Sequence, residues 1–211
     1  MMAEGRGVVS FSPGSKYMVL DAGGGTIDIT VHEVMTGGKL KELHKASGGS
    51  WGGTRVDDGY RQFLIRLVGK SVFQRFQSEK KDDYLDMFRD FETKKRDIAP
   101  EKKTKVMIRL PTSLKDIFED ETKEDLPNVI KQTHYAEMVS IMGDKLRVDA
   151  SVMKGLFSKA IQNTVSHVKE LLKDGRVQGI SNILMVGGFS ESKMLQHAIK
   201  YNFPNVKVIV P

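Results

Sequence analysis

The run DAGGGTID, from Asp21 to Asp28, combines residue types that suit phosphate chemistry. Three consecutive glycines allow the backbone to turn with positive φ, so that several N–H groups can point at one anion. Thr26 adds a hydroxyl donor. The carboxylates of Asp21 and Asp28 flank the turn, where a hydrated divalent cation or an attacking water would sit beside a terminal phosphate. An ordinary glycine-rich hairpin needs neither three glycines nor a carboxylate on each side, so the run indicates phosphoryl-group chemistry.

Three further segments could complete such a site. The glycine pair Gly52–Gly53 lies in ASGGSWGGTRVDD, and the pair Gly187–Gly188 follows a buried strand in NILMVGGFSES. In ETKKRDIA, the spacing i, i+3 and i+4 would place Glu92, Lys95 and Arg96 on one helix face. Taken alone, such charges are typical of solvent-facing ion pairs, and such glycines are typical of any flexible strand-to-helix turn.

In combination and in this order, the motifs resemble those of the actin, hexokinase and 70-kDa heat-shock ATPase superfamily, in the heat-shock style, over about residues 17–210. The resemblance implies a chaperone ATPase that binds ATP or ADP with Mg²⁺. The implied catalytic residues are Asp21, Thr26 and Asp28, and Asp21 and Asp28 would also hold Mg²⁺ through water. The implied nucleotide contacts are Gly23, Gly24, Gly25, Thr26, Gly52, Gly53, Glu92, Lys95, Arg96, Gly187, Gly188 and Phe189.

The match is nearest to a divergent branch of the heat-shock family, in which Phe and a serine-containing helix start follow the second glycine pair. Two positions depart from the main family. Glu191 stands where the main family has an arginine, and Ala99 stands where it has a serine. A carboxylate cannot stack on adenine as a guanidinium does, so we expect altered base affinity or base choice.

The resemblance places this chain in the second of two lobes that enclose the family's active site. The first lobe would supply another phosphate loop, an acidic cation partner and a catalytic lysine, and the sequence shows no motif for them. Phosphoryl transfer needs positioned groups on both sides of the phosphates. We therefore expect weak nucleotide binding and negligible hydrolysis by this lobe alone, with a co-chaperone or client protein as a further implied partner.

The composition excludes several function classes. The chain has no cysteine, which excludes disulfides and cysteine nucleophiles. No apolar run approaches the roughly 20 residues of a membrane span, and the first residues lack the apolar region of a secretory signal, so we expect a cytoplasmic protein without a membrane partner. The formal charge of +6 favours an anionic partner such as a nucleotide. No stacking aromatic residues interleave with the lysines at 94–105, so we expect no nucleic-acid partner.

The hydrophobic pattern predicts an α/β fold, and the resemblance implies a ribonuclease H-like, actin-like ATPase lobe. The periodicity and the glycine breaks predict a three-strand antiparallel meander and a final helix-strand-helix-strand unit. The predicted strands of these parts are 17–20, 27–34, 40–46, 180–186 and 206–210, and the helices are 149–173 and 190–200. Between them we predict helices at 56–78 and 82–97, a strand at 105–110, and weaker strands at 129–139 and 146–148. The first of these helices carries a core-facing apolar stripe of Tyr60, Phe63, Leu64, Leu67 and Val68.

This organisation predicts three parts of the chain. Residues 1–15 would form a flexible leader, and residues 16–56 with 150–211 would form the actin-like core subdomain. Residues 57–149 would form an inserted α+β subdomain with helices and a small sheet.

Other functions fit parts of the sequence. The segment GGSWG satisfies the G-x-S-x-G pattern of hydrolase nucleophile elbows, with Ser50 as the nucleophile, although it follows only three strands of a meander. A sugar kinase or actin relative fits the superfamily but not the triple glycine and the E-x-x-K-R helix. A non-enzymatic protein-interaction module that retains the fold remains the main alternative. The five histidines show no metal-binding spacing.

Overall fold

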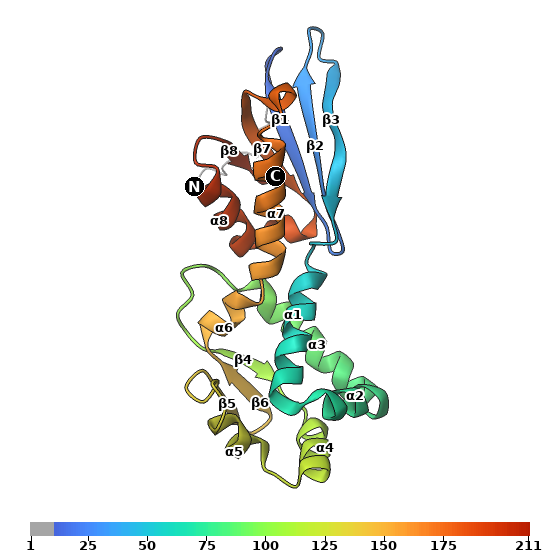
Figure 1. The fold of residues 1–211 in the computed structure, drawn as a ribbon, viewed down its shortest axis with the longest axis vertical. Coiled ribbons are helices and arrows are strands. Elements are labelled where there is room, and N and C mark those ends of the chain that lie inside the picture. The colour runs from blue at the N-terminus through green and yellow to red at the C-terminus, as the bar shows by residue number, and fades with distance from the viewer. Residues whose placement is uncertain (1–10) are drawn as a thin grey trace, which may run out of the picture.

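The computed structural model describes residues 11–211 and contains two β-sheets (Figure 1). The larger sheet has the strand order β3-β2-β1-β7-β8. Its strands are β1 (Lys16–Ala22), β2 (Ile27–Val34), β3 (Leu40–Gly49), β7 (Ile180–Val186) and β8 (Lys207–Ile209). Strands β1, β2 and β3 pair antiparallel, whereas β7 pairs parallel with β1 and β8 pairs parallel with β7. The predicted meander and the predicted final strand-helix-strand connection are confirmed.

The smaller sheet is antiparallel throughout and has the order β4-β6-β5. Its strands are β4 (Val106–Arg109), β5 (Val139–Met142) and β6 (Lys145–Val148). Five helices accompany it, namely α1 (Thr54–Val68), α2 (Lys70–Glu79), α3 (Lys81–Arg96), α4 (Thr112–Thr122) and α5 (Leu126–Lys131). The two sheets lie at opposite ends of an elongated body (Figure 1).

Helices α6 (Ala150–Gly155) and α7 (Ser158–Leu171) lead from the smaller sheet to the larger one (Figure 1). Helix α8 (Lys193–Asn202) lies beside the larger sheet, and the short 3₁₀ turns are η1 (Gly175–Val177) and η2 (Gly188–Glu191). One continuous hydrophobic core includes residues from both sheets and from α1, α3 and α7. Within it Tyr60 of α1 stacks on Phe91 of α3 with ring centroids 3.9 Å apart, which fixes these two helices side by side.

The predicted helix at 56–78 is wrong as a single element, because the chain breaks at Gly69. Gly69 has φ of +84°, a conformation that ends α1 and that only glycine adopts freely. The predicted apolar stripe itself is correct, since Tyr60, Phe63 and Leu64 are fully buried. Periodicity located the buried face but not the break.

The predicted helix at 149–173 is also divided. Asp149 caps its first part, because its carboxylate accepts from the backbone N–H of Ser151 at 2.8 Å, and this bond lowers the pKa of Asp149. The helix stops at Gly155 and resumes at Ser158, which leaves Phe157 buried at the junction. Glycine has a low helix propensity, so Gly155 is a natural place for the interruption.

The predicted strand at 129–139 is wrong over most of its length. Residues Leu126–Lys131 form α5, and only the last predicted residue, Val139, begins β5. Asp125 precedes this helix and Pro127 lies in its first turn, which is the sequence signal of a helix start. That signal outweighs the β-branched residues that suggested a strand. The other predicted strands and helices agree with the structure to within a few residues at their ends.

Residues 1–10 of the predicted leader lie outside the described residues. Strand β1 begins at Lys16, one residue before the predicted start of the first strand. Residues before it already contact the sheet, since the N–H of Gly14 donates to the carbonyl of Val34 at 2.7 Å. Over the described part of the chain, no helix is long and apolar enough to cross a membrane.

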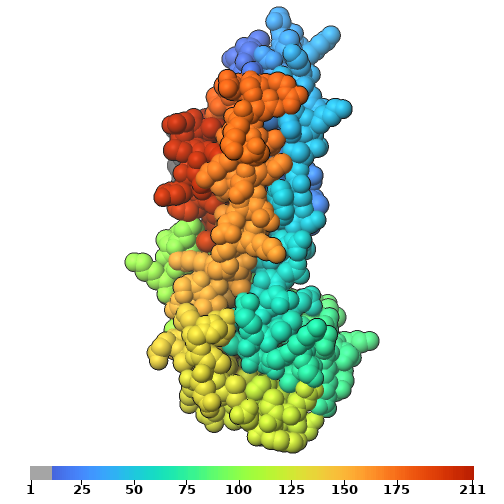
Figure 2. All heavy atoms as spheres, in the orientation of Figure 1, coloured from blue at the N-terminus to red at the C-terminus, as the bar shows by residue number. Residues whose placement is uncertain are grey.

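A histidine–serine–histidine link joins β3 to α7. The hydroxyl oxygen of Ser47 lies 3.0 Å from Nε2 of His44 and 2.9 Å from Nε2 of His167. Helix α7 runs down the face of the molecule between α8 and β3 (Figure 2). A hydroxyl has one proton, so it donates to one ring and accepts from the other. Burial, followed by the nearby His44 ring, lowers the pKa of His167.

The lowered pKa of His167 predicts a loss of stability in mild acid. In the unfolded chain His167 takes up a proton near pH 6.5, whereas in the folded chain it does so only at lower pH. The free energy of unfolding therefore falls as the pH drops through 6.5. We expect a lower melting temperature at about pH 5.5 than at about pH 7.5, and a smaller difference in His167→Gln. The matched control His197→Gln changes an exposed ring on α8 and keeps the wild-type difference. The same change in melting temperature between the two pH values in the wild type and both variants would contradict the role of His167.

Candidate functional site

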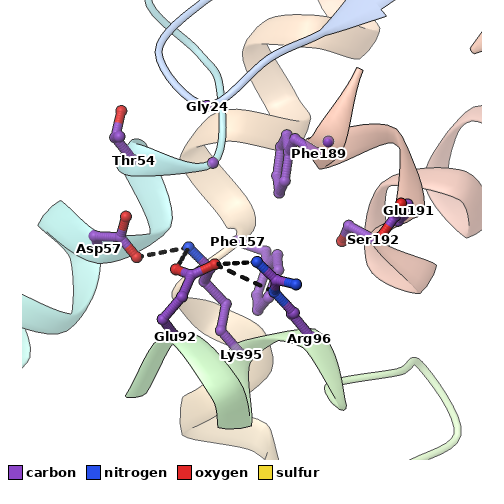
Figure 3. A pocket seen from close by; sticks show the side chains of 12 residues that line it. Gly24, Thr54, Asp57, Glu92, Lys95, Arg96, Phe157, Phe189, Glu191 and Ser192 are labelled. Carbon is purple, nitrogen blue, oxygen red and sulfur yellow. Dashed lines mark hydrogen bonds and ion pairs between the residues drawn. The ribbon is translucent and has the colours of Figure 1, made fainter. Parts of the chain in front are cut away.

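A cavity of about 550 Å³ lies where the larger sheet meets α1 and α3 (Figure 3). This volume is in the range of small-molecule sites. Segments far apart in the sequence contribute to it: the β1–β2 hairpin, the start of α1, the end of α3, the α6–α7 junction and η2. The lining residues are Gly24, Gly53, Thr54, Asp57, Glu92, Lys95, Arg96, Phe157, Gly188, Phe189, Glu191 and Ser192.

The DAGGGTID run forms the hairpin between β1 and β2. Asp21 and Asp28 are directly opposite each other across the two strands, and both side chains are exposed. The hydroxyl of Thr26 donates to Oδ2 of Asp28 at 2.9 Å, and the N–H of Gly23 donates to the carbonyl of Thr26. The structure therefore places two carboxylates and one hydroxyl beside the loop that carries the three glycines.

Three backbone N–H groups of this loop are available to a ligand. The N–H groups of Gly24, Gly25 and Thr26 donate no hydrogen bond within residues 11–211, and all three residues are exposed. The carbonyls of the same loop are occupied, because the N–H groups of Gly53 and Thr54 donate to Gly23 and Gly24 at 3.2 and 2.8 Å. A loop with occupied acceptors and free donors suits an anion.

The predicted reason for the three glycines is wrong, since none of Gly23, Gly24 and Gly25 has positive φ. Close backbone approach explains a neighbouring glycine instead. A Cβ on Gly52 would lie 2.4 Å from the carbonyl oxygen of Gly23 and 2.6 Å from that of Gly24. A glycine is therefore needed at position 52 to bring the start of α1 against the loop of the β1–β2 hairpin.

The second glycine pair lies against the same hairpin from the other side. Gly187 has φ of +85°, and a Cβ there would lie 2.5 Å from the carbonyl oxygen of Ala22 and 2.6 Å from Oδ1 of Asp21. The last residue pair between β1 and β7 is Asp21 with Val186. The turn that follows β7 therefore runs past the carboxylate of Asp21. The chain next enters η2, whose Gly188 and Phe189 line the cavity.

A charged cluster lines the cavity on the side of α1 and α3. Lys95 is 9% exposed; its ammonium group donates to Oδ1 of Asp57 at 2.7 Å and also pairs with Glu92 (Figure 3). Burial raises the pKa of Asp57, although the hydrogen bond from Lys95 opposes this shift. The cluster thus holds a buried cation between two carboxylates and presents both donors and acceptors to the cavity.

The opposite part of the cavity combines aromatic and charged side chains. Phe189 packs over Gly53, and Phe157 lies deeper beside Lys95 and Arg96 (Figure 3). Arg96 bonds Glu92 at 3.4 Å, and its side chain is 72% exposed. Glu191 lies across the cavity from Asp57 (Figure 3).

The structure brings most of the predicted nucleotide contacts together. Seven of them line the cavity, namely Gly24, Gly53, Glu92, Lys95, Arg96, Gly188 and Phe189. The other five contacts lie in the same glycine segments but not in the cavity lining, and so do the predicted catalytic and Mg²⁺ residues Asp21 and Asp28; the five are Gly23, Gly25, Thr26, Gly52 and Gly187. The assignment of individual roles to these residues stays a prediction.

Sequence reasoning missed four lining residues, Thr54, Asp57, Phe157 and Ser192. Asp57 could have been found, because it lies one turn into the helix that follows the glycine pair, where a carboxylate can pair with a lysine on a neighbouring helix. Phe157 could not, since its position depends on the interruption between α6 and α7.

The elbow hypothesis for Ser50 gains no support. Ser50 follows β3, which is an edge strand of an antiparallel meander and not a central parallel strand. Over residues 11–211 no histidine forms a hydrogen bond with Ser50; the serine that contacts His44 and His167 is Ser47.

The described features define a mixed α/β protein in which three glycine segments converge on a cavity with a buried lysine. Comparison with known proteins gives relatives that match most of the chain. The chain is 32% identical over 201 residues to human heat shock 70 kDa protein 12B, a match that covers 94% of this chain and 29% of that protein. Human heat shock 70 kDa protein 12A is 30% identical over 200 residues, covering 94% of this chain and 30% of that protein.

A bacterial relative extends the comparison. Chaperone protein DnaK of Thermotoga petrophila is 27% identical over 204 residues, which cover 92% of this chain and 29% of that protein. No family model matches the chain. The chain spans less than a third of the length of these relatives. It belongs to the 70-kDa heat-shock protein family, which confirms the resemblance given by the motifs.

The geometry of Gly187 gives a test of the converging segments. Gly187→Ala forces a side chain into a left-handed backbone conformation and against the Ala22 carbonyl, so we expect the free energy of unfolding to fall by about 1–3 kcal/mol or more. Gly188→Ala is the matched control, because nothing lies within 4 Å of its added Cβ; it should change stability by less than about 0.5 kcal/mol. Urea denaturation measures both, and equal stabilities of the two variants would contradict the described turn.

Proposed function

We propose that the chain is the nucleotide-binding lobe of a heat-shock 70 kDa-like chaperone, with the actin-like fold that the motifs imply. The observation that carries the proposal is the set of free N–H groups at Gly24, Gly25 and Thr26, at the rim of a cavity whose wall holds a buried lysine. Free backbone donors suit phosphate oxygens, and the cavity has room for a nucleoside. ATP and ADP are the nucleotides that the family resemblance suggests.

The hairpin would bind the phosphates. Its three N–H groups are free donors, and the hydroxyl of Thr26 would donate to a phosphate in exchange for its bond to Asp28. Asp21 and Asp28 are acceptors for the water shell of a cation. The described residues contain no group of three His, Cys, Asp or Glu side chains that could hold a metal alone. This fits Mg²⁺, which keeps several waters and is bound through one or two carboxylates together with phosphate oxygens. When bound, Mg²⁺ would neutralise phosphate charge.

The charged cluster would bind the sugar. Glu92 and Lys95 lie beside each other on α3, and together they offer an acceptor and a donor to vicinal hydroxyls. Asp57 holds the ammonium group from α1 at 2.7 Å, so the donor is fixed before a ligand arrives. Such preorganisation lowers the entropy lost on binding.

Hydrolysis would need more than these groups. Within residues 11–211, every group assigned to the phosphates comes from the hairpin and the glycine segments packed on it. Phosphoryl transfer requires stabilising groups around the whole transition state, so we propose that a second lobe completes the catalytic site. The lobe alone would bind nucleotide and turn it over negligibly.

Isothermal titration with Mg-ADP and Mg-ATP tests this function. We expect the wild-type chain to bind both, and Asp21→Ala and Thr26→Ala to bind at least about tenfold more weakly, since each loses a charge-assisted or hydroxyl contact. Their melting temperatures should stay close to that of the wild type, because both side chains are exposed.

The matched control is Asp116→Ala, which removes an exposed carboxylate on α4 outside the cavity and should leave affinity unchanged. Failure of the wild-type chain to bind either nucleotide at millimolar concentration would contradict the proposal and favour the interaction module. Unchanged affinity in Asp21→Ala and Thr26→Ala would contradict the assignment of the hairpin to the phosphates.

A further inference from the structure

The histidine–serine–histidine link between β3 and α7 is separate from the cavity of the proposed nucleotide site. The cavity lining, within residues 11–211, includes neither His44, Ser47 nor His167. Strand β3 contributes His44 and Ser47, and helix α7 contributes His167. All three residues are half-buried, so solvent still reaches them. The fold therefore brings two imidazole rings together near the surface, although their spacing in the sequence does not predict a pair.

The two rings direct the same nitrogen at one point. Nε2 of His44 is 3.0 Å from the hydroxyl oxygen of Ser47, and Nε2 of His167 is 2.9 Å from it. The hydroxyl has a single proton, so it donates to only one of the two nitrogens, and the other ring must carry its own proton on Nε2. A metal ion at this point would instead accept the lone pairs of both nitrogens, with both rings neutral.

The distances suit a transition-metal ion. Imidazole nitrogens bind Zn²⁺ at about 2.0–2.1 Å. An ion in place of the Ser47 hydroxyl would therefore require each Nε2 to move by no more than about 1 Å, while the hydroxyl turns to another rotamer. No group of three His, Cys, Asp or Glu side chains in the described part of the chain could hold a metal, so water would fill the remaining positions of the ion.

We propose that His44 and His167 form a binding site for a divalent transition-metal ion such as Cu²⁺ or Zn²⁺. Imidazole suits these ions, whereas Mg²⁺ and Ca²⁺ take oxygen ligands. The bound ion ties β3, an edge strand of the larger sheet, to helix α7. It stabilises the folded chain, because the two ligands come together only on folding. The site does not depend on the proposed nucleotide binding, and a chain that binds no nucleotide would still bind the ion.

Trp51 allows a direct test of this site. It is the single tryptophan of the chain, and its ring centroid lies 5.3 Å from that of His167. Cu²⁺ quenches tryptophan fluorescence at short range, whereas Zn²⁺ has a filled d shell and does not. We expect saturable quenching by Cu²⁺ in the nucleotide-free chain. An excess of Zn²⁺ should restore the fluorescence, because Zn²⁺ competes for the same nitrogens with lower affinity.

Three variants and one control identify the ligands. His44→Gln keeps the contact between Trp51 and His167 and should weaken Cu²⁺ binding by at least about tenfold, and His167→Gln should do the same. Ser47→Ala removes both hydrogen bonds but keeps both rings, so it should bind Cu²⁺ at least as tightly as the wild type does. The matched control His197→Gln removes an exposed ring on α8 and should bind Cu²⁺ as the wild type does.

Thermal melting gives a second readout that does not depend on fluorescence. Melting of the metal-free proteins shows which variants are folded, and Zn²⁺ should then raise the melting temperature of the wild type and Ser47→Ala but not of the two histidine variants. Absence of saturable Cu²⁺ binding by the wild type would overturn the proposal. Wild-type affinity for Cu²⁺ in both His44→Gln and His167→Gln would overturn it too. Loss of Cu²⁺ binding in a folded Ser47→Ala variant would overturn the assignment of the two rings as sufficient ligands.

Discussion

The close approach of three backbone segments at glycine positions is the constraint on which the site depends. Gly52 allows the start of α1 to lie against the β1–β2 hairpin, and Gly187 allows the turn after β7 to pass the carboxylate of Asp21. At either position a Cβ would lie within 2.6 Å of a backbone oxygen. Because the segments interlock through carbonyls, the loop keeps its own N–H groups free. The hydrogen bonds that hold the start of α1 against the hairpin use the carbonyls of the loop, so its N–H groups stay free to bind a phosphate.

The second constraint is the buried ion pair between α1 and α3. The side chain of Lys95 is only 9% exposed, so its ammonium group has lost most of its hydration. The carboxylates of Asp57 and Glu92 compensate for that loss. The stacking of Tyr60 on Phe91 holds the same two helices together one turn further along. The stacked rings and the ion pair together hold α1 and α3 in place, and these helices form one wall of the cavity. A wall that is fixed in this way suits a preorganised binding site.

The sequence predicted the parts of this structure that depend on local chemistry. Alternating apolar residues and tight glycine breaks predicted the meander, and the stripe Tyr60, Phe63, Leu64 predicted the buried face of α1. The charged set on α3 was predicted to face one side, and it does line the cavity.

What the sequence could not show depends on tertiary contacts. The pairing of Lys95 with Asp57 joins residues 38 positions apart, and no local pattern connects them. The break at Gly69 and the interruption before Phe157 could not be read from periodicity, because the apolar spacing continues through both. The positive φ predicted for the hairpin glycines is not found, and close backbone approach requires glycine instead at Gly52 and Gly187. A single sequence gives no information on which backbone oxygen a Cβ would meet.

The proposed function requires that the free N–H groups of Gly24, Gly25 and Thr26 bind phosphate. The most direct measurement is the backbone amide ¹H–¹⁵N spectrum of the chain during titration with a Mg-nucleotide. We expect the largest saturable shifts at these three amides, with downfield movement typical of new hydrogen bonds. Shifts confined to other parts of the chain, such as α4 and α5, with these three amides unmoved at saturation, would contradict it.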